Sequence, residues 1–201
     1  SINRGTIHNS VITYNYTSGD GGGVDINEGY LKNCLVAGNE AGTYGGGLNR
    51  VDNPQTIYNC TVVRNSAGTA GGGIYSSVIS RPNLFLNNII CSNQAAGNTN
   101  DIAGSVGSFR DNFSYCCSAD LIDGVNGNIT DSPMFVSSGS GYGTNAVLGN
   151  YILYKTSPCE DTGLNQSWMT TTLTNDLAGY ARILPATDGT VNMGAYEFTL
   201  P

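Results

Sequence analysis

Short apolar stretches flanked by asparagine recur along the first half of the chain and form its most regular pattern. Each stretch places five residues between two Asn that are six positions apart. The four copies are Asn9-Ser-Val-Ile-Thr-Tyr-Asn15, Asn33-Cys-Leu-Val-Ala-Gly-Asn39, Asn59-Cys-Thr-Val-Val-Arg-Asn65 and Asn87-Asn-Ile-Ile-Cys-Ser-Asn93. Runs of about five residues with alternating apolar positions predict short β-strands.

A second repeat, of three consecutive glycines, runs in step with the first. The triplets are 21–23, 45–47 and 71–73. A period of this length, about 24–28 residues, indicates a solenoid in which each coil contains strands joined by turns and a Gly-rich bend. Parallel strands connected in this way follow a right-handed crossover. The sequence therefore predicts an all-β fold, a right-handed parallel β-helix.

Stacking places equivalent residues of successive coils in columns about 4.8 Å apart. Two columns alternate with polar positions and are expected to face inward: Ile12, Val36, Val62 and Ile90, and Ser10, Cys34, Cys60 and Asn88. Two further columns are predicted to form side-chain amide ladders at the bends: Asn9, Asn33, Asn59 and Asn87, and Asn15, Asn39, Asn65 and Asn93.

The repeat weakens after Asn93, which divides the chain into two predicted parts. Residues 1–136 are expected to form the coils, with a loop over 95–108 and irregular last coils near 109–116 and 128–136. Residues 137–201 are expected to cap the stack, because an open solenoid end needs an atypical unit to cover it. A strand is predicted over 191–198. At the other end, a bare coil edge at Ser1 predicts either further upstream coils or a head-to-tail neighbour.

Composition excludes some classes of function. Only 8 residues are Lys or Arg against 15 Asp or Glu, so the chain lacks the basic surface that nucleic acids require. No apolar run approaches the roughly 20 residues of a membrane-spanning helix. With 28 Gly and few charged residues, the chain suits an extracellular or cell-surface location.

The repeats and the tail together resemble a known family. A Gly triplet followed by Ile, Val or Leu and then by the Asn-flanked stretch resembles the repeats of bacterial surface β-helix proteins, including the chlamydial polymorphic membrane proteins. Three tail segments resemble the choice-of-anchor region of such proteins: 157–163, 176–182 and 192–198, preceded by a similar segment at 128–136. Asn192 departs from the pattern, since Asp is usual there. The resemblance implies a secreted or surface-displayed scaffold with no defined catalytic residues.

Acidic residues supply the candidate chemistry. Glu28 and Asp52 follow their Gly triplets at the same offset, and adjacent coils would bring them close enough for glycoside hydrolysis. Both also suit solvated turns. Asp120, Asp123 and Asp131, with Asp101 and Asp111 nearby, are candidate Ca²⁺ ligands, although Asp is common in turns. No other cofactor is indicated.

The tail and the cysteines have mainly structural interpretations. Asp161, Asp176, Arg182 and Glu197 are predicted to form ion pairs and turn bonds that hold irregular backbone. Cys34 and Cys60 share a column and are expected to be buried thiols, although their spacing also permits a disulfide. Cys116, Cys117 and Cys159 are the residues expected to bridge the cap to the coils.

Three functions fit these patterns. The favoured one is a non-enzymatic surface module for adhesion, glycan binding or matrix assembly, with a flat face of the stack as its contact surface. The second is a polysaccharide lyase or glycoside hydrolase, which the β-helix fold also supports. The third is a self-assembling structural unit.

Overall fold

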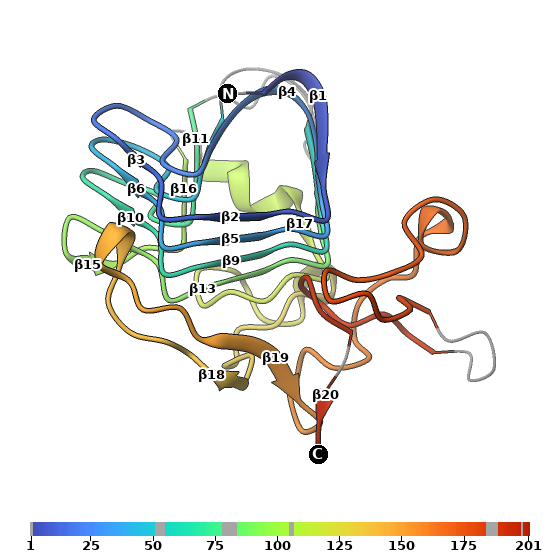
Figure 1. Cartoon of the computed structure of the whole chain (residues 1–201). Helices are drawn as coiled ribbons and strands as arrows, with labels where there is room; N and C mark the ends of the chain where they lie inside the picture. The colour runs from blue at the N-terminus through green and yellow to red at the C-terminus, as the bar shows by residue number, and fades with distance from the viewer. Residues whose placement is uncertain (1, 51–54, 78–83, 105–106, 184–188, 198) are drawn as a thin grey trace.

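The protein folds as a parallel β-solenoid of about four turns (Figure 1). The structure is a computed structural model that describes residues 2–50, 55–77, 84–104, 107–183, 189–197 and 199–201. The predicted all-β class and stacked parallel coils are confirmed. None of the helical segments in the described ranges is long and apolar enough to cross a bilayer.

Three sheets form the sides of the stack. The eight-stranded sheet runs β16 (Ile102–Gly104), β11 (Ile74–Ser76), β7 (Leu48–Arg50), β4 (Val24–Lys32), β8 (Gln55–Tyr58), β12 (Leu84–Leu86) and β17 (Phe113–Ser114), with β1 (Ile2–His8) also paired to β4. The four-stranded sheet runs β13 (Ile89–Cys91), β9 (Thr61–Val63), β5 (Leu35–Ala37) and β2 (Val11–Thr13). The five-stranded sheet runs β15 (Asn98–Thr99), β14 (Gln94–Ala95), β10 (Ser66–Ala67), β6 (Glu40–Ala41) and β3 (Tyr16–Thr17).

The register of the four-stranded sheet matches the repeat in the sequence. Ile12 pairs with Val36, Val36 with Val62, and Val62 with Ile90. The last three side chains are fully buried, as are Cys34 and Cys60 in the neighbouring column. The prediction that both columns face inward is therefore confirmed, and they form the core of the stack with Ile26, Leu31, Leu48, Ile57 and Ile74.

The Gly triplets are required by close backbone approach between coils. The first glycine of each triplet has a left-handed φ, between 64° and 71°. At the second position there is no room for a side chain, because a Cβ on Gly46 would lie 2.3 Å from the Ser66 carbonyl oxygen. Glycine is the residue that satisfies both conditions without strain, so the triplets mark the bend in each coil.

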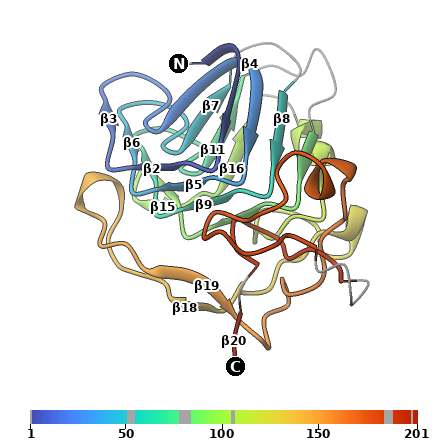
Figure 2. The ribbon, with the colours of Figure 1, turned by 45° about the vertical axis from the view of Figure 1, so that its right-hand side comes forward.

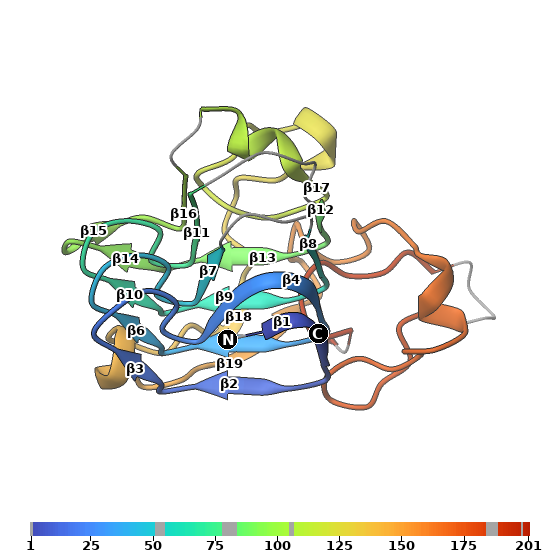
Figure 3. The ribbon, with the colours of Figure 1, turned by 90° about the horizontal axis from the view of Figure 1, so that it is seen from above.

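Segments after the fourth coil cover the end of the stack. The turn η1 (Gly107–Asn112) and strand β17 bring Phe109 and Phe113 onto Phe85, with ring centroids 4.2–5.5 Å apart. Figure 3 shows η1 and η2 (Val125–Gly127) gathered beyond β12 and β17. The stretch 95–108, predicted as a loop, includes β15, which folds back antiparallel on β14, and β16, which pairs in parallel with β11.

The C-terminal region packs on the outside of the four-stranded sheet. It contains a three-stranded sheet of β18 (Phe135–Ser137), β19 (Asn150–Tyr154) and β20 (Thr199–Leu200), together with η3 (Gly143–Asn145) and η4 (Ser167–Thr170). A second apolar cluster joins Leu35, Val63 and Ile89 to Tyr151 and Met193. Residues 191–197 form turns rather than the predicted strand, which is instead β20. The sheet face expected to be free is therefore mostly covered, although Val11 of the first coil stays 58% exposed.

Candidate functional site

The inner asparagine column forms a continuous ladder of side-chain hydrogen bonds. Each amide nitrogen of Asn15, Asn39 and Asn65 donates to the Oδ1 atom of the next Asn at 2.9–3.0 Å, and each backbone N–H donates to the same oxygen. Asn39, Asn65 and Asn93 also donate to a carbonyl of the preceding coil. The predicted ladder is confirmed for this column.

The ladder ends in a carboxylate rather than a further amide. Asp101 Oδ1 accepts the backbone and side-chain N–H groups of Asn93, both at 2.9 Å. Asp120 in turn accepts the backbone N–H groups of Asp101 and Ile102 at 2.8 Å. Burial raises the pKa of Asp101 to about 6, against the bonds from Asn93, which lower it, and with a further increase from Asp120. Asp101 is therefore a titratable end to an otherwise neutral ladder.

This raised pKa predicts that stability falls as pH rises. Between the unfolded pKa near 3.8 and the folded value near 6, the folded chain binds more protons, so the free energy of unfolding decreases across that window. The expected loss is about 3 kcal/mol. Urea unfolding from pH 4 to 8 measures it. Asp101→Asn keeps the acceptor and removes the titration, so its curve should be flatter than that of the wild type, and equal slopes would contradict the account.

A groove opens beside Asp101, between the last coil and the C-terminal strands. It has a volume of about 640 Å³. Asp101 and Asp131 both line it, and Asp131 is exposed, whereas Asp101 is buried. Tyr142 and Tyr154 contribute aromatic rings, and the Tyr142 ring lies over the Arg64 guanidinium at 5.4 Å. Six Ser and Thr hydroxyl groups also line it, from Ser92, Thr99, Ser118, Thr130, Ser132 and Ser138.

The groove combines the groups that recognise a polar ligand with apolar faces. Hydroxyl and carboxylate groups exchange hydrogen bonds with ligand hydroxyls, and the tyrosines offer flat apolar surface. Tyr154 is 37% exposed, so its ring is accessible to a ligand. A concave surface that mixes apolar and convergent polar groups is the usual form of a small-ligand site.

The outer asparagine column does not form the predicted ladder. Asn33, Asn59 and Asn87 have φ near 50–57° and are fully buried, yet only Asn59 and Asn87 bond to each other, at 3.3 Å. Their amides donate to carbonyls of the C-terminal region: Asn33 to Asn175, Asn59 to Asn192 and Asn87 to Leu164. In a left-handed bend the side chain points away from the stack, so this column anchors the cap. Asn9, in the first coil, is exposed.

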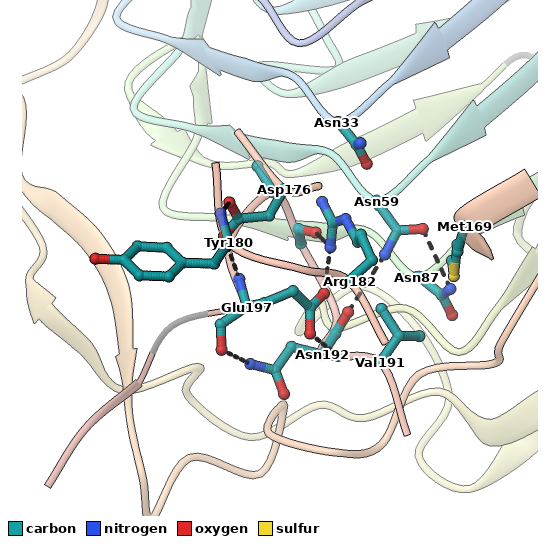
Figure 4. A network of polar contacts seen from close by, with 12 residues as sticks. Asn33, Asn59, Asn87, Met169, Asp176, Tyr180, Arg182, Val191, Asn192 and Glu197 are labelled. Atoms are coloured by element: carbon teal, nitrogen blue, oxygen red, sulfur yellow. Dashed lines mark hydrogen bonds and ion pairs between the residues drawn. The ribbon is translucent and has the colours of Figure 1, made fainter. Parts of the chain in front are cut away.

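The tail residues Asp176, Arg182 and Glu197 meet in one polar network (Figure 4). Arg182, which is 2% exposed, forms an ion pair with Glu197 and donates to the Gly194 carbonyl at 3.1 Å. Asp176 accepts the backbone N–H groups of Ala178, Tyr180 and Glu197 at 2.7–2.9 Å. Burial raises the pKa of Glu197 to about 7, although Arg182 lowers it. These bonds fix irregular backbone.

Asn192 belongs to the same network, and it joins Asp161 to the network through the Asp161 backbone. Asn192, the departure from the family pattern, donates to the Glu197 carbonyl and accepts the Asp161 backbone N–H at 2.7 Å. The amide thus makes a donor bond that a carboxylate cannot. Asp161 itself has an exposed side chain and contributes its backbone.

The carboxylate pair expected from the repeat stays a prediction, because only Glu28 of the two residues is described. Glu28 forms an ion pair with Arg4 and pairs in register with Asn3. Asp52 lies outside the described residues. The register also shifts there: residues 24 apart pair at Ile26 and Arg50, but residues 26 apart pair at Gly29 and Gln55.

The three candidate Ca²⁺ ligands have separate surroundings. Asp120 caps the backbone at Asp101, Asp123 accepts the Thr130 N–H at 3.2 Å, and Asp131 lies in the groove. Within the described ranges, no group of three or more Asp, Glu, His or Cys side chains is arranged to hold a metal ion.

All six cysteines are free thiols, so the bridge expected among Cys116, Cys117 and Cys159 is not formed. Cys34, Cys60 and Cys116 point inward and donate to backbone carbonyls at 3.1–3.2 Å. Cys116 continues the column of Cys34, Cys60 and Asn88, since its Sγ accepts the Asn88 N–H, and Cys117 faces the opposite side. Alternation along the strand thus separates the two neighbours.

Fold and site together define a parallel β-solenoid whose C-terminal region closes a hydroxyl-rich and aromatic groove at the end of an asparagine ladder. No family model, curated protein or solved structure matches this chain.

Proposed function

We propose that this chain is a non-enzymatic glycan-binding module of an extracellular or cell-surface protein, and that the groove beside Asp101 is its binding site. The observation that carries the proposal is the lining of that groove. Five of the six hydroxyls, all but that of the buried Ser118, and the exposed Asp131 carboxylate can bond to sugar hydroxyls, while Tyr142 and Tyr154 can stack on sugar ring faces. The volume of about 640 Å³ suits a short oligosaccharide segment.

The sequence supports the proposed location. The repeats and tail resemble bacterial surface β-helix proteins with a choice-of-anchor region, and that resemblance favours a displayed scaffold. Adhesion or matrix assembly would follow from glycan binding by such a scaffold.

A second function, glycoside hydrolysis, is favoured by one observation. Asp101 has a pKa raised to about 6 and lines the same groove as the exposed Asp131, and hydrolysis needs an acid and a base on either side of the bond. Binding is preferred because Oδ1 of Asp101 already accepts two bonds of the ladder, and that carboxyl group is 2% exposed.

A panel of neutral and acidic polysaccharides tests the proposal, read for retained protein and for new chain ends. We expect retention without new ends, and about ten-fold weaker binding for Tyr154→Ala. Tyr154→Phe keeps the ring and should retain binding. Tyr16→Ala, an exposed tyrosine of the first coil, is the surface control. New ends that disappear in Asp131→Asn would replace the binding proposal with hydrolysis. The absence of both retention and new ends on every polymer would refute both proposals.

A further inference from the structure

A second feature that points to a ligand lies on the outside of the eight-stranded sheet, away from the groove residues. Lys32 ends β4, its register partner Tyr58 ends β8, and Tyr30 precedes Lys32 on the same face. Trp168 comes from η4 of the C-terminal region. Figure 2 shows this orange turn beside the lower part of the sheet. We call these four residues the aromatic–lysine cluster.

The cluster holds one ammonium group among three aromatic rings. Lys32 Nζ lies 5.3 Å from the Tyr30 ring centroid, 5.6 Å from that of Tyr58 and 5.1 Å from that of Trp168. The Tyr58 and Trp168 rings are parallel within 2°, with centroids 6.1 Å apart. Tyr30 is 49% exposed, and the other three side chains are partly exposed, so the cluster is open to solvent.

Among the described residues, no acid forms an ion pair with Lys32. The ion pairs in the described ranges join Arg4 to Glu28 and Arg182 to Glu197, and Lys32 takes part in neither. The net charge of the chain is −7, so an ammonium seated on aromatic rings is a local exception. Partial burial lowers the pKa of Lys32, which agrees with an ammonium that has lost water without gaining a carboxylate.

We propose that the aromatic–lysine cluster binds an anionic sugar unit, with the pyranose ring stacked on the aromatic side chains and its carboxylate or sulfate group paired with Lys32 Nζ. The exposed face of an aromatic ring, most accessible at Tyr30, provides the flat apolar surface that a sugar face requires, and the Lys32 ammonium supplies the charge partner for the anionic group. This inference deepens the proposed function, because it names the chemical class of the glycan and adds a second contact surface.

Trp168 is the only tryptophan in the chain, so its fluorescence reports on this cluster directly. The titrants are an oligogalacturonate, a sulfated galactan fragment and a neutral galactan fragment. We expect a saturable change with at least one anionic titrant and none with the neutral one. The affinity should weaken at least ten-fold between 0.05 and 0.5 M NaCl. A response to only one anionic titrant identifies uronate or sulfate as the group that is bound.

Variants separate binding from structural packing. Lys32→Gln should weaken the anionic response at least ten-fold, whereas Lys32→Arg should keep it, and both should unfold at temperatures close to the wild type. Tyr154→Ala, in the groove, should leave the Trp168 response unchanged. If retention on polysaccharides depends on Tyr154 but Trp168 fluorescence responds to no anionic titrant, the cluster proposal fails and the groove proposal stands. If Trp168 fluorescence responds to an anionic titrant but Tyr154→Ala does not change retention, the groove proposal fails and the cluster proposal stands. An unchanged affinity in Lys32→Gln also overturns the proposal.

Discussion

Replacing Asn65 with Ala is expected to lower the free energy of unfolding by about 4 kcal/mol or more. The Asn65 side chain lies in the middle of the ladder and makes four hydrogen bonds: two from Asn39 to its Oδ1 atom, and two from its Nδ2 atom to Asn93 and the Val36 carbonyl. Its removal leaves buried groups without partners on both sides, and each such group costs about 1–3 kcal/mol. Urea unfolding followed by circular dichroism measures the change.

The matched control is Asn15→Ala at the exposed start of the same ladder. The Asn15 side chain donates one bond, to Asn39, and its backbone N–H keeps its own bond to the same oxygen in the variant. The expected loss is below about 1 kcal/mol. Equal losses in the two variants would show that the ladder does not stabilise the stack through its buried rungs.

Arg182→Met carries the second largest expected effect, about 3–5 kcal/mol at pH 8, because it leaves the Glu197 carboxylate buried without its cation. The loss should be smaller at pH 5. There Glu197, with a folded pKa near 7 in the wild type and higher in the variant, is neutral and needs no partner. Urea unfolding at the two pH values measures the difference, and limited proteolysis reports whether the C-terminal region has come loose.

The double variant Arg182→Met, Glu197→Gln is the control for that experiment. Removing both charges eliminates the buried unpaired carboxylate, so much of the lost stability should return at pH 8. A double variant that is as unstable as Arg182→Met would mean that the packing of the long arginine side chain matters, and not its charge. A single variant with wild-type stability would contradict the structural role of the network.

The repeat was enough to predict the solenoid, because stacked coils place chemically similar residues at equivalent positions. The column of Ile12, Val36, Val62 and Ile90 reads directly from the sequence, and the structure pairs those residues in register. Spacing alone did not distinguish the two Asn columns. Asn15 begins the column that bonds along the stack, whereas Asn33 sits in a left-handed bend that turns its amide toward the cap.

The groove was less accessible to prediction, for physical reasons. Asp101 follows Asn93 by 8 residues instead of a full coil, because β15 folds back on β14, so the repeat gave no signal that it continues the ladder. Tyr142 and Tyr154 come from the irregular C-terminal region, which has no period to place them. Trp168 was visible as the single tryptophan, but its approach to Lys32 depends on how that region docks.

Hydrogen exchange in the presence of a retained glycan tests the groove most directly. Slower exchange is predicted for backbone amides at 117–119 and 130–135, which line the groove, with unchanged exchange in the first coil at 11–17. The protection should disappear in Tyr154→Ala. Protection confined to the first coil, or retention of glycan with no change at 117–119 and 130–135, would contradict the account.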